Sequence, residues 1–393
     1  MTARAPLRVA FTIIPRRIWA GGYNYQSNLF AALNRYRQGE IAPIVFAGEQ
    51  DDAADLEALA RIPGVETAQS AAFDRRRAGL AAALSLGLDY AAVAEFRKRK
   101  VDVVFESARF FGWRLPYPAV AWFPDFQHQR LPQLFSPTAR WQREFGFRVQ
   151  IASRRTIMLS SESALRDCQK LYPGAAHRTS VVRFATQPPP DLLTANPSDV
   201  IEHYGLPSKY FYLPNQFWRH KNHQVVVDAL AILAKRGDDV VVAASGSKGD
   251  PREPDYFDRI MRQVVERGLE KNFRYLGMVP LPHVYALLRA ATALINPSRF
   301  EGWSTTVEEA KSFGVPMILS NIDVHREQTD GEASYFGIND PSSLADLLAK
   351  ASQNPEPALV RNLLPDLDAR VAAFASDFVG TVQRATQCYR RAT

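Results

Sequence analysis

Cysteine is scarce in this chain, since two residues, Cys168 and Cys388, stand among 393. They lie far apart and match no ligand spacing such as Cys-x-x-Cys, so the sequence argues against a cysteine-based metal cluster. Two cysteines also cannot build the disulfide framework of a small secreted scaffold. We therefore expect the protein to work in a reducing compartment, the cytoplasm.

Long apolar runs are missing as well, because no stretch approaches the ~20 apolar residues of a membrane-spanning helix. The nearest candidate, Ala78 to Leu88, is 11 residues long and rich in alanine, and we expect a buried or interfacial helix there. Val9 to Ile14 is apolar but is followed at once by Pro15-Arg16-Arg17. This pattern is typical of a first core strand and not of a signal peptide.

The charge is uneven along the chain. The net charge is +7, but residues 1–185 hold 26 Lys and Arg against 16 Asp and Glu, whereas residues 186–393 hold 22 against 25. The basic first half could attract anionic lipid, a phosphorylated acceptor or nucleic acid. Two basic clusters, Arg75 to Arg77 and Arg97 to Lys100, could dock it on an anionic membrane. A merely solvated basic surface is the alternative. No nucleic-acid-binding motif accompanies the charge, so we expect no nucleic-acid partner.

Short β-rich runs alternate with helical stretches in the first half of the chain. A helix is expected over Tyr23 to Tyr36. Buried strands are expected at Arg8 to Ile14, Ile41 to Ala47, Val101 to Phe105, Val120 to Phe123, Thr156 to Ser160 and Thr179 to Arg183. Strands separated by helices imply crossover connections and a parallel sheet that is covered on both faces.

The alternation is interrupted once and then restarts. Pro188-Pro189-Pro190 and Asn196-Pro197-Ser198 break regular structure, which is typical of a linker. Strands are then expected at Tyr210 to Leu213, Val240 to Ala244, Phe273 to Leu276, Ala293 to Asn296 and Pro316 to Ser320.

This restart predicts an α/β protein of two Rossmann-like doubly wound domains that face a cleft. We expect a first domain over residues 1–186, a linker over 187–208 and a second domain over 209–372. The remaining residues, 373–393, are expected to form a helix that packs back on the first domain. Ligands of such sheets bind beyond the carboxyl ends of the strands.

The most informative stretch is Asn296-Pro297-Ser298-Arg299-Phe300-Glu301-Gly302-Trp303-Ser304-Thr305-Thr306-Val307-Glu308-Glu309-Ala310. It comprises the end of a strand, a short loop and the start of a helix. The N–H groups and the dipole of a helix start suit a phosphate. The candidate donor-binding residues of this loop are Gly302, Trp303, Ser304 and Thr305. With Thr305 as the N-cap, Glu308 would stand at N3 and complete a capping box.

This stretch closely resembles the Glu-x7-Glu signature of the retaining glycosyltransferases with the GT-B fold, family four. The preceding Asn-Pro-Ser and the following Gly314-Val315-Pro316 belong to the resemblance. It implies that Glu301 contacts hydroxyls of the transferred sugar and that Glu309 binds the ribose of the nucleotide. The resemblance covers nearly the whole chain, densely over residues 205–340 and thinly over residues 50–100, where acceptor domains differ.

The segment Tyr212 to His223 resembles the part of the same family in which an Arg and, five residues later, a Lys grip the donor pyrophosphate. Lys221 matches the Lys, whereas Gln216 stands at the position of the Arg. Arg219 or Asn215 could compensate for this departure. For Lys221 itself, a solvated lysine at a helix start is the alternative.

Two loops of the first half carry further candidates. Trp19-Ala20-Gly21-Gly22-Tyr23-Asn24 resembles the Gly-rich loop of the family, which lies near the acceptor and the donor phosphate; a plain strand–helix turn is the alternative. The family often carries a His that touches the donor sugar after the strand at Val120 to Phe123. The resemblance therefore makes His128 a catalytic candidate, with Asp125 second, and a structural histidine is the alternative.

The resemblance implies a glycosyltransferase whose catalytic residues are Glu301, Lys221 and His128. Its donor would be a nucleoside diphosphate sugar, which is a co-substrate, so no cofactor is expected. The acceptor would be a saccharide or a lipid-linked sugar of bacterial cell-surface polysaccharide or lipopolysaccharide assembly, reached in the cytoplasm or on the cytoplasmic face of the inner membrane. No metal is expected, because Asp-x-Asp occurs only at Asp366-Leu367-Asp368, in the C-terminal helical region. A nucleotide-sugar 2-epimerase and a non-catalytic carbohydrate-binding protein are the alternatives.

Overall fold

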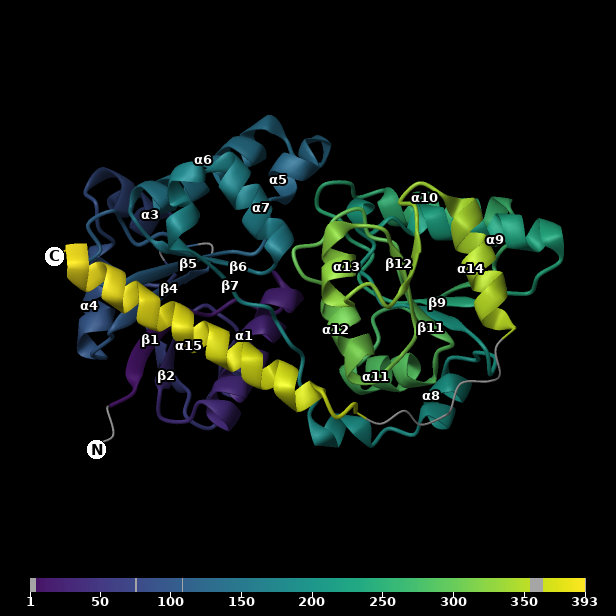
Figure 1. Ribbon diagram of the computed structural model, residues 1–393, viewed down its shortest axis with the longest axis horizontal. Helices are drawn as coiled ribbons and strands as arrows, with labels where there is room; N and C mark the ends of the chain where they lie inside the picture. Colours follow the sequence, from purple (N-terminus) through teal and green to yellow (C-terminus); the bar gives the residue numbers. More distant parts are fainter. Residues whose placement is uncertain (1–4, 75, 108, 354–362, 393) are drawn as a thin grey trace. The chain divides into compact units, whose positions relative to one another are not determined.

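The computed structural model describes residues 5–74, 76–107, 109–353 and 363–392. The chain forms two compact units (Figure 1). The first comprises Met1–Gln129, Ser136–Gln187 and Asp368–Thr393, and the second comprises Arg130–Phe135 and Pro188–Leu367.

The first unit is built on a parallel sheet. Its strands are β1 (Leu7–Thr12), β2 (Ile41–Ala47), β3 (Glu66–Gln69), β4 (Val103–Ser107), β5 (Ala119–Phe123), β6 (Thr156–Leu159) and β7 (Thr179–Val181). They lie in the order β3-β2-β1-β4-β5-β6-β7, with Leu7 opposite Ile41 and Val104 opposite Ala119. Every residue of β4 and β5 is buried, as expected for a parallel sheet covered on both faces.

Helices cover both faces of this sheet. They are α1 (Ala20–Tyr36), α2 (Ala53–Ala60), α3 (Arg76–Ser85), α4 (Tyr90–Lys98), α5 (Gln127–Arg130), α6 (Pro137–Ala152), α7 (Glu162–Leu171), the 3₁₀ turn η2 (Pro173–Arg178) and α15 (Leu367–Ala392). The α15 helix packs through Phe378, whose ring lies 5.9 Å from Phe11 and 5.7 Å from Phe105. The C-terminal helix therefore belongs to the first unit from Asp368 onward, earlier than the predicted residue 373.

The second unit repeats the plan. Its strands are β8 (Phe211–Leu213), β9 (Val242–Ala244), β10 (Phe273–Tyr275), β11 (Ala293–Asn296), β12 (Met317–Ser320) and β13 (Ser334–Phe336). They lie parallel in the order β10-β9-β8-β11-β12-β13. Its helices and 3₁₀ turns are η1 (Pro132–Leu134), η3 (Pro190–Leu193), α8 (Pro197–His203), η4 (Arg219–Lys221), α9 (His223–Arg236), α10 (Tyr256–Glu266), α11 (Leu281–Ala290), α12 (Thr305–Ser312), α13 (Asp323–Gln328) and α14 (Pro341–Ser352).

The predicted linker is folded into the second unit. Asn196 caps α8 by accepting a hydrogen bond from the Ser198 backbone, and Pro197 stands at the first helical position. Pro at that position starts a helix because the missing N–H is not needed there. Val200 of α8 then packs in the core with Leu287. The Asn-Pro-Ser sequence is thus a helix start and not a break.

The predicted fold class, two Rossmann-like doubly wound domains, is confirmed by the two strand orders. Each sheet reverses its order at one point, between β1 and β4 in the first unit and between β8 and β11 in the second. The loops after these strands are where such folds bind ligands. The cleft between the domains stays a prediction.

The α3 helix lies where a buried or interfacial helix was expected, and its exposure argues against the buried alternative. It runs over Arg76–Ser85, and of its side chains only Ala83 is buried. In the part of the chain that the structure describes, no single helix is long and apolar enough to cross a membrane. The α3 and α4 helices meet such a test of length and composition only as a pair, which is bent by 102°.

Candidate active site

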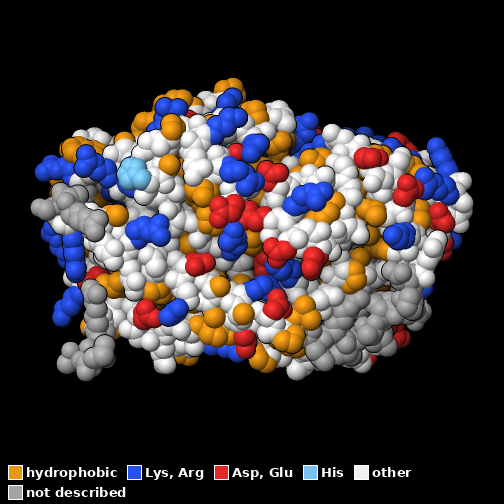
Figure 2. Space-filling model, viewed as in Figure 1, with side chains coloured by type: hydrophobic (Ala, Val, Ile, Leu, Met, Phe, Trp, Pro, Cys, Tyr) orange, Lys and Arg blue, Asp and Glu red, His pale blue; other side chains and the backbone are white. Residues whose placement is uncertain are grey.

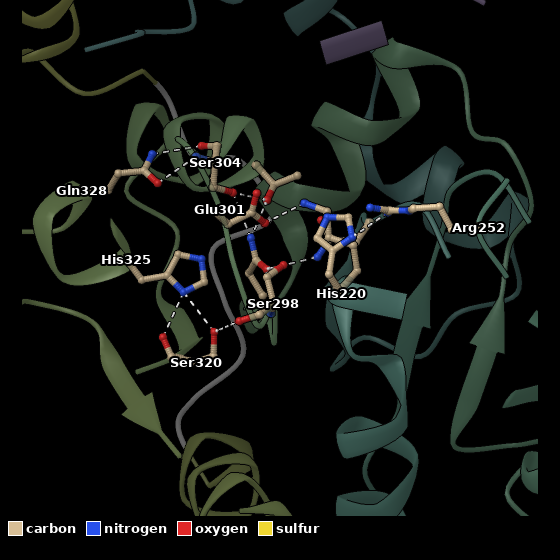
Figure 3. A network of polar contacts seen from close by, with 12 residues as sticks. His220, Arg252, Ser298, Glu301, Ser304, Ser320, His325 and Gln328 are labelled. Carbon is tan, nitrogen blue, oxygen red and sulfur yellow. Dashed lines mark hydrogen bonds and ion pairs between the residues drawn. The ribbon is translucent and has the colours of Figure 1, made fainter. Parts of the chain in front are cut away.

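Lys221 and Glu301 meet between β8 and β11, where the second sheet reverses its strand order. Figure 3 shows Glu301 within the polar network of this region. Lys221 ends the 3₁₀ turn after β8, and Glu301 lies in the loop after β11. The Lys221 Nζ donates a hydrogen bond to the Glu301 Oε1 over 2.6 Å. The two side chains are 16% and 9% exposed, so the pair is largely shielded from water.

The two signature glutamates have opposite electrostatics. Burial alone would raise the pKa of Glu301, but the charge of Lys221 outweighs it and lowers the pKa to about 2. Glu309, in α12, is 5% exposed, and burial raises its pKa to about 8. Among the described residues, no hydrogen bond reaches the Glu309 carboxyl group. At pH 7, Glu301 is therefore ionised and Glu309 is protonated, and such divergent pairs are frequent at functional sites.

Asn296, the last residue of β11, is fully buried and joins the loop after β8 to the loop after β11. Its Oδ1 accepts hydrogen bonds from the Asn215 Nδ2 at 3.3 Å and from the Ser298 Oγ at 2.7 Å. Its Nδ2 donates to the Ser304 Oγ at 2.9 Å. Asn215, predicted to compensate for the missing Arg, is 3% exposed and acts here as a brace between loops.

The start of α12 is fixed by Gln328 of α13. The Gln328 Oε1 accepts from the Ser304 N–H at 2.9 Å, and its Nε2 donates to the Ser304 carbonyl at 3.0 Å and to the Glu308 Oε1 at 3.1 Å. The predicted capping box is wrong, because Ser304 and not Thr305 is the N-cap. The Ser304 N–H is already bonded, which leaves Gly302, Trp303 and Thr305 as the partly exposed members of the predicted loop.

In the loop after β8, Arg219 pairs with a glutamate of the loop after β9. Arg219 is 52% exposed and forms an ion pair with Glu253 at 3.4 Å, whereas Gln216 is partly exposed. Arg252, on the loop after β9, contacts the residue next to Lys221. Its guanidinium lies 3.1 Å from the His220 Nδ1 and 3.1 Å from Asp250. Sequence reasoning missed Arg252 because nothing in the family pattern marks that loop.

Two neutral histidines border the ion pair and were also missed. Burial lowers the pKa of His220 to about 3 and that of His325 to about 4. The His325 Nδ1 donates to the Ser320 carbonyl at 2.9 Å, so its Nε2 is an acceptor. That Nε2 atom is buried without a hydrogen-bond partner among the described residues. Figure 3 shows His325 and His220 on opposite sides of Glu301. No sequence signal distinguishes His325 from a core histidine.

His128 and Asp125 of the first unit serve its helices. His128 is completely buried, with its Nε2 3.3 Å from the Glu144 Oε2 and its ring edge-on to Phe147. Asp125 accepts from the Gln127 N–H at 2.9 Å and from Arg143 at 2.7 Å. A side chain without exposed surface cannot touch a sugar in this conformation. In this structure His128 therefore has a structural role, and its contact with a sugar stays a prediction.

Gly21 and Gly22 lie in the first turn of α1 and not in a loop. A Cβ on Gly22 would stand 2.3 Å from the indole ring of Trp19, and one on Gly21 would stand 3.1 Å from its Nε1. The side chain that approaches these glycines is thus an indole, whereas the sequence predicted a ligand.

A metal site has no counterpart among the residues described. Within them, no group of three or more His, Cys, Asp or Glu is arranged to hold an ion. That the protein works without a metal or a cofactor stays a prediction.

Comparison with solved structures agrees with this fold. Over their whole length, the chain superposes on a glycosyltransferase from Rickettsia africae with a TM-score of 0.65 at 13% identity, covering 99% of this chain and 98% of that one. It superposes equally well, at 0.65 and 17% identity, on HepE of Anabaena in complex with UDP and glucose, covering 98% and 99%. The fold is thus that of the GT-B glycosyltransferases.

The sequence relatives match parts of the chain. Residues 203–362 match the family model described as glycosyl transferases group 1. O-antigen chain mannosyltransferase B of Escherichia coli is 44% identical over 69 residues, 16% of this chain and 17% of that protein. The O-antigen biosynthesis glycosyltransferase WclY of Escherichia coli is 30% identical over 95 residues, 24% and 26%. The chain thus matches about a sixth to a quarter of the length of these relatives.

Proposed function

We propose that the protein is a retaining, metal-independent glycosyltransferase that uses a nucleoside diphosphate sugar. The acceptor is a saccharide or a lipid-linked sugar of bacterial cell-surface polysaccharide. The observation that carries this proposal is the Lys221–Glu301 pair at the strand reversal, with Glu309 on the helix that starts beside it. Relatives named for O-antigen synthesis and a similar fold solved with UDP and glucose support it.

Each part of a donor has a chemically suitable partner in this arrangement. When the anomeric bond breaks, negative charge grows on the departing diphosphate. Lys221 is a preorganised cation for that charge, and removing one such donor typically costs ~2.7–4 kcal/mol of barrier. Glu301 is ionised and accepts hydrogen bonds from the sugar hydroxyls, while Glu309 meets the ribose. Glycosidase-type catalysis would need two carboxyl groups on opposite sides of the anomeric carbon. Here both carboxyl groups are assigned to substrate hydroxyls, so neither serves as that nucleophile. In the proposed mechanism the acceptor therefore attacks the anomeric carbon from the same face that the phosphate leaves.

A thermal-shift screen tests the donor. UDP, GDP, ADP and their sugars are added to the protein, with GDP-mannose included because two relatives are named as mannosyltransferases. A nucleotide at 100 times its dissociation constant stabilises the fold by ~2.7 kcal/mol. Stabilisation by one nucleotide, followed by acceptor-dependent release of that nucleotide, supports the transferase. A nucleotide sugar that is isomerised without release would favour the 2-epimerase, and no stabilisation by any nucleotide would favour a carbohydrate-binding protein.

The first unit carries a surface suited to a membrane, which we call the α3 surface. It consists of Leu80, Leu84, Leu86, Tyr90 and Trp113, which are 46%, 36%, 57%, 56% and 56% exposed. Trp113 adjoins the α3–α4 turn, because a Cβ on Gly87 would stand 2.8 Å from its ring. Arg114 lies over the Trp113 ring at 5.8 Å. Over α3 and α6, Figure 2 shows hydrophobic and basic side chains next to one another.

The two basic clusters of the sequence do not share one surface. Arg76 pairs with Asp51, beyond the carboxyl end of β2, whereas Arg99 pairs with Glu66 at the start of β3. Arg76 and Arg99 thus lie at opposite ends of the parallel strands, and Arg75 lies outside the described residues. Exposed leucines beside Trp and Tyr are typical of a membrane interface. These features support the proposal that the first unit contacts an anionic bilayer, on its cytoplasmic face, through the α3 surface.

A further inference from the structure

The β1–α1 loop presents an aromatic ring where the first sheet reverses its strand order. Trp19 stacks on Trp122 with ring centres 5.4 Å apart and planes at 21°. Trp122 in turn stacks on Tyr25 at 4.2 Å and 24°. The Trp122 Nε1 donates to the Ser160 Oγ at 3.2 Å, which fixes the middle ring. Trp19 is the outer ring: it is 36% exposed, against 6% for Trp122 and 3% for Tyr25.

Gly21 and Gly22 of α1 leave room for the Trp19 ring. Glycine within a helix costs roughly 1 kcal/mol relative to alanine, and neither Gly21 nor Gly22 has the positive φ that would require glycine. What the missing Cβ atoms provide is room, since a Cβ at Gly22 would stand 2.3 Å from the indole. The chain thus gives up helix stability to hold Trp19 flat against Trp122.

The chemistry of an exposed indole face selects its ligand. The face of an aromatic ring carries negative potential, so it disfavours a diphosphate and suits a neutral, flat, partly apolar group. The C–H face of a pyranose is such a group. Ile18, 63% exposed, extends the apolar surface of the same loop.

We propose that Trp19 is a stacking platform for a pyranose ring of the acceptor, an inference that rests on the proposed transferase function. Its place at the strand reversal of the first sheet is where a doubly wound domain binds ligands, and the donor residues are all in the second unit. Gly21 and Gly22 serve the acceptor through Trp19 and do not contact the donor phosphate.

The first experiment compares Trp19→Ala and Trp19→Phe with Trp141→Ala. Trp141 is a matched control, because it is 64% exposed and stacks on Phe145 at 5.2 Å and 12°. In the full-length protein, Trp19→Ala raises the acceptor KM by about 3- to 10-fold, while the donor KM and the acceptor-free hydrolysis of the donor stay unchanged. Trp19→Phe keeps part of the affinity and Trp141→Ala keeps all of it. Equal acceptor KM values for Trp19→Ala and Trp141→Ala would overturn the proposal.

The glycines give a second, graded test. Gly22→Ala displaces the indole and reproduces the acceptor defect of Trp19→Ala, whereas Gly21→Ala has a smaller effect. Both variants remain helical by circular dichroism because alanine favours the helix. A rise in donor KM for both, without an acceptor effect, would instead support a phosphate loop and overturn the platform.

A binding measurement separates this proposal from the transferase function. Methyl α-mannoside, methyl α-glucoside and methyl α-galactoside are titrated by saturation-transfer NMR, which needs no turnover. Binding of at least one glycoside that is lost in Trp19→Ala supports the platform even if no transfer is found. No binding of any of the three, or equal binding to the variant, would overturn it while leaving nucleotide stabilisation as the test of the transferase.

Discussion

At the scale of single residues, Glu309 is a carboxyl group that a ligand should deprotonate. Its pKa is about 8 in the buried position on α12, so it holds a proton at pH 7. Ribose hydroxyls donate to an ionised carboxylate, which makes nucleotide binding release that proton. We expect the affinity for the matching nucleotide to rise by about 10-fold between pH 7 and pH 9, because the ionised fraction rises by that factor.

Isothermal titration at pH 7, 8 and 9 measures this slope, and Glu309→Gln is the control because it cannot titrate. A slope that survives in Glu309→Gln would show that another group titrates. A flat profile in the wild type would remove Glu309 from the nucleotide site.

Lys221 pairs with Glu301 and, in the proposed transferase, also stabilises the leaving group, so a single variant would change both. Lys221→Ala should lower turnover by ~10²–10³ through the leaving group. It also leaves Glu301 buried without its cation, and breaking such a pair costs ~3–5 kcal/mol of stability. The ionised state of Glu301 stabilises the fold above its unfolded pKa, and this contribution is lost as the pH falls toward its folded pKa of about 2.

The double variant Lys221→Ala, Glu301→Gln separates these roles. We expect it to recover most of the free energy of unfolding, measured by urea denaturation, and none of the turnover. Turnover within a few-fold of wild type in a folded Lys221→Ala protein would make Lys221 a surface lysine.

The third prediction concerns the arginine of the family pattern, whose position is occupied by Gln216 in this chain. Arg219 points to Glu253 and is half exposed, so Arg219→Ala should change kcat/KM by less than about 3-fold, the range of an exposed ion pair. Arg252 contacts both His220 and Asp250 beside the Lys221 loop. Arg252→Ala should therefore lower kcat/KM more than Arg219→Ala, and steady-state kinetics of both variants would show the order. The reverse order would restore Arg219 as the substitute.

At the scale of elements, the sequence predicted best what is buried on both sides. The strands at Ile41–Ala47 and Ala293–Asn296 were predicted with the observed bounds, because a fully buried strand is a continuous apolar run. The strands β3 and β13 were missed, since they are three or four residues long and contain polar residues such as Glu66 and Ser334. They stand at sheet edges, where pairing and not hydrophobicity defines the strand.

The site was predicted only as far as its motif reaches. Glu301 and Lys221 could be named because the family pattern marks both, and the structure brings them together. Asn296 and Gln328 matter through side-chain contacts between separate segments of the chain. No spacing in the sequence reports such contacts, because they depend on which strand neighbours which.

Gln328 gives a prediction at this scale, since one side chain joins α13 to the start of α12. Gln328→Ala removes the partners of the Ser304 N–H and carbonyl, and each buried group left unsatisfied costs ~1–3 kcal/mol. We expect lower stability in urea together with weaker nucleotide binding, because the loop before α12 loses its brace. Glu308→Gln is the matched control, since its amide oxygen still accepts from Gln328. Equal effects of the two variants would contradict the brace.

At the scale of the whole molecule, the family match lies inside one of the two units. The matched residues, 203–362, fall within the second unit, which also holds the Lys221–Glu301 pair. The first unit shares the fold but carries its own surfaces, the Trp19 stack and the α3 surface. In the proposed transferase, the second unit binds the donor and the first unit the acceptor. The family match lies in the second unit, so the sequence offers more candidate residues for the donor than for the acceptor.

The α3 surface makes the last prediction, which concerns how the protein is held at a membrane. Vesicles with anionic lipid should sediment the protein at low salt, neutral vesicles should bind it weakly, and binding should fall as salt rises, since each basic residue near the surface contributes ~1 kcal/mol within a Debye length. Replacing Leu80, Leu84 and Trp113 by Gln should abolish binding, because the apolar contact is lost while the charge is kept. Replacing Arg97 and Lys98 by Gln should leave most of it, because these residues lie at the far end of α4 from α3 and Lys98 already pairs with Glu95 at 2.7 Å. If the Arg97 and Lys98 variant lost binding and the Leu80, Leu84 and Trp113 variant kept it, the membrane contact would lie at the end of α4 instead. No binding to anionic vesicles at low salt would mean that the first unit meets its acceptor in solution.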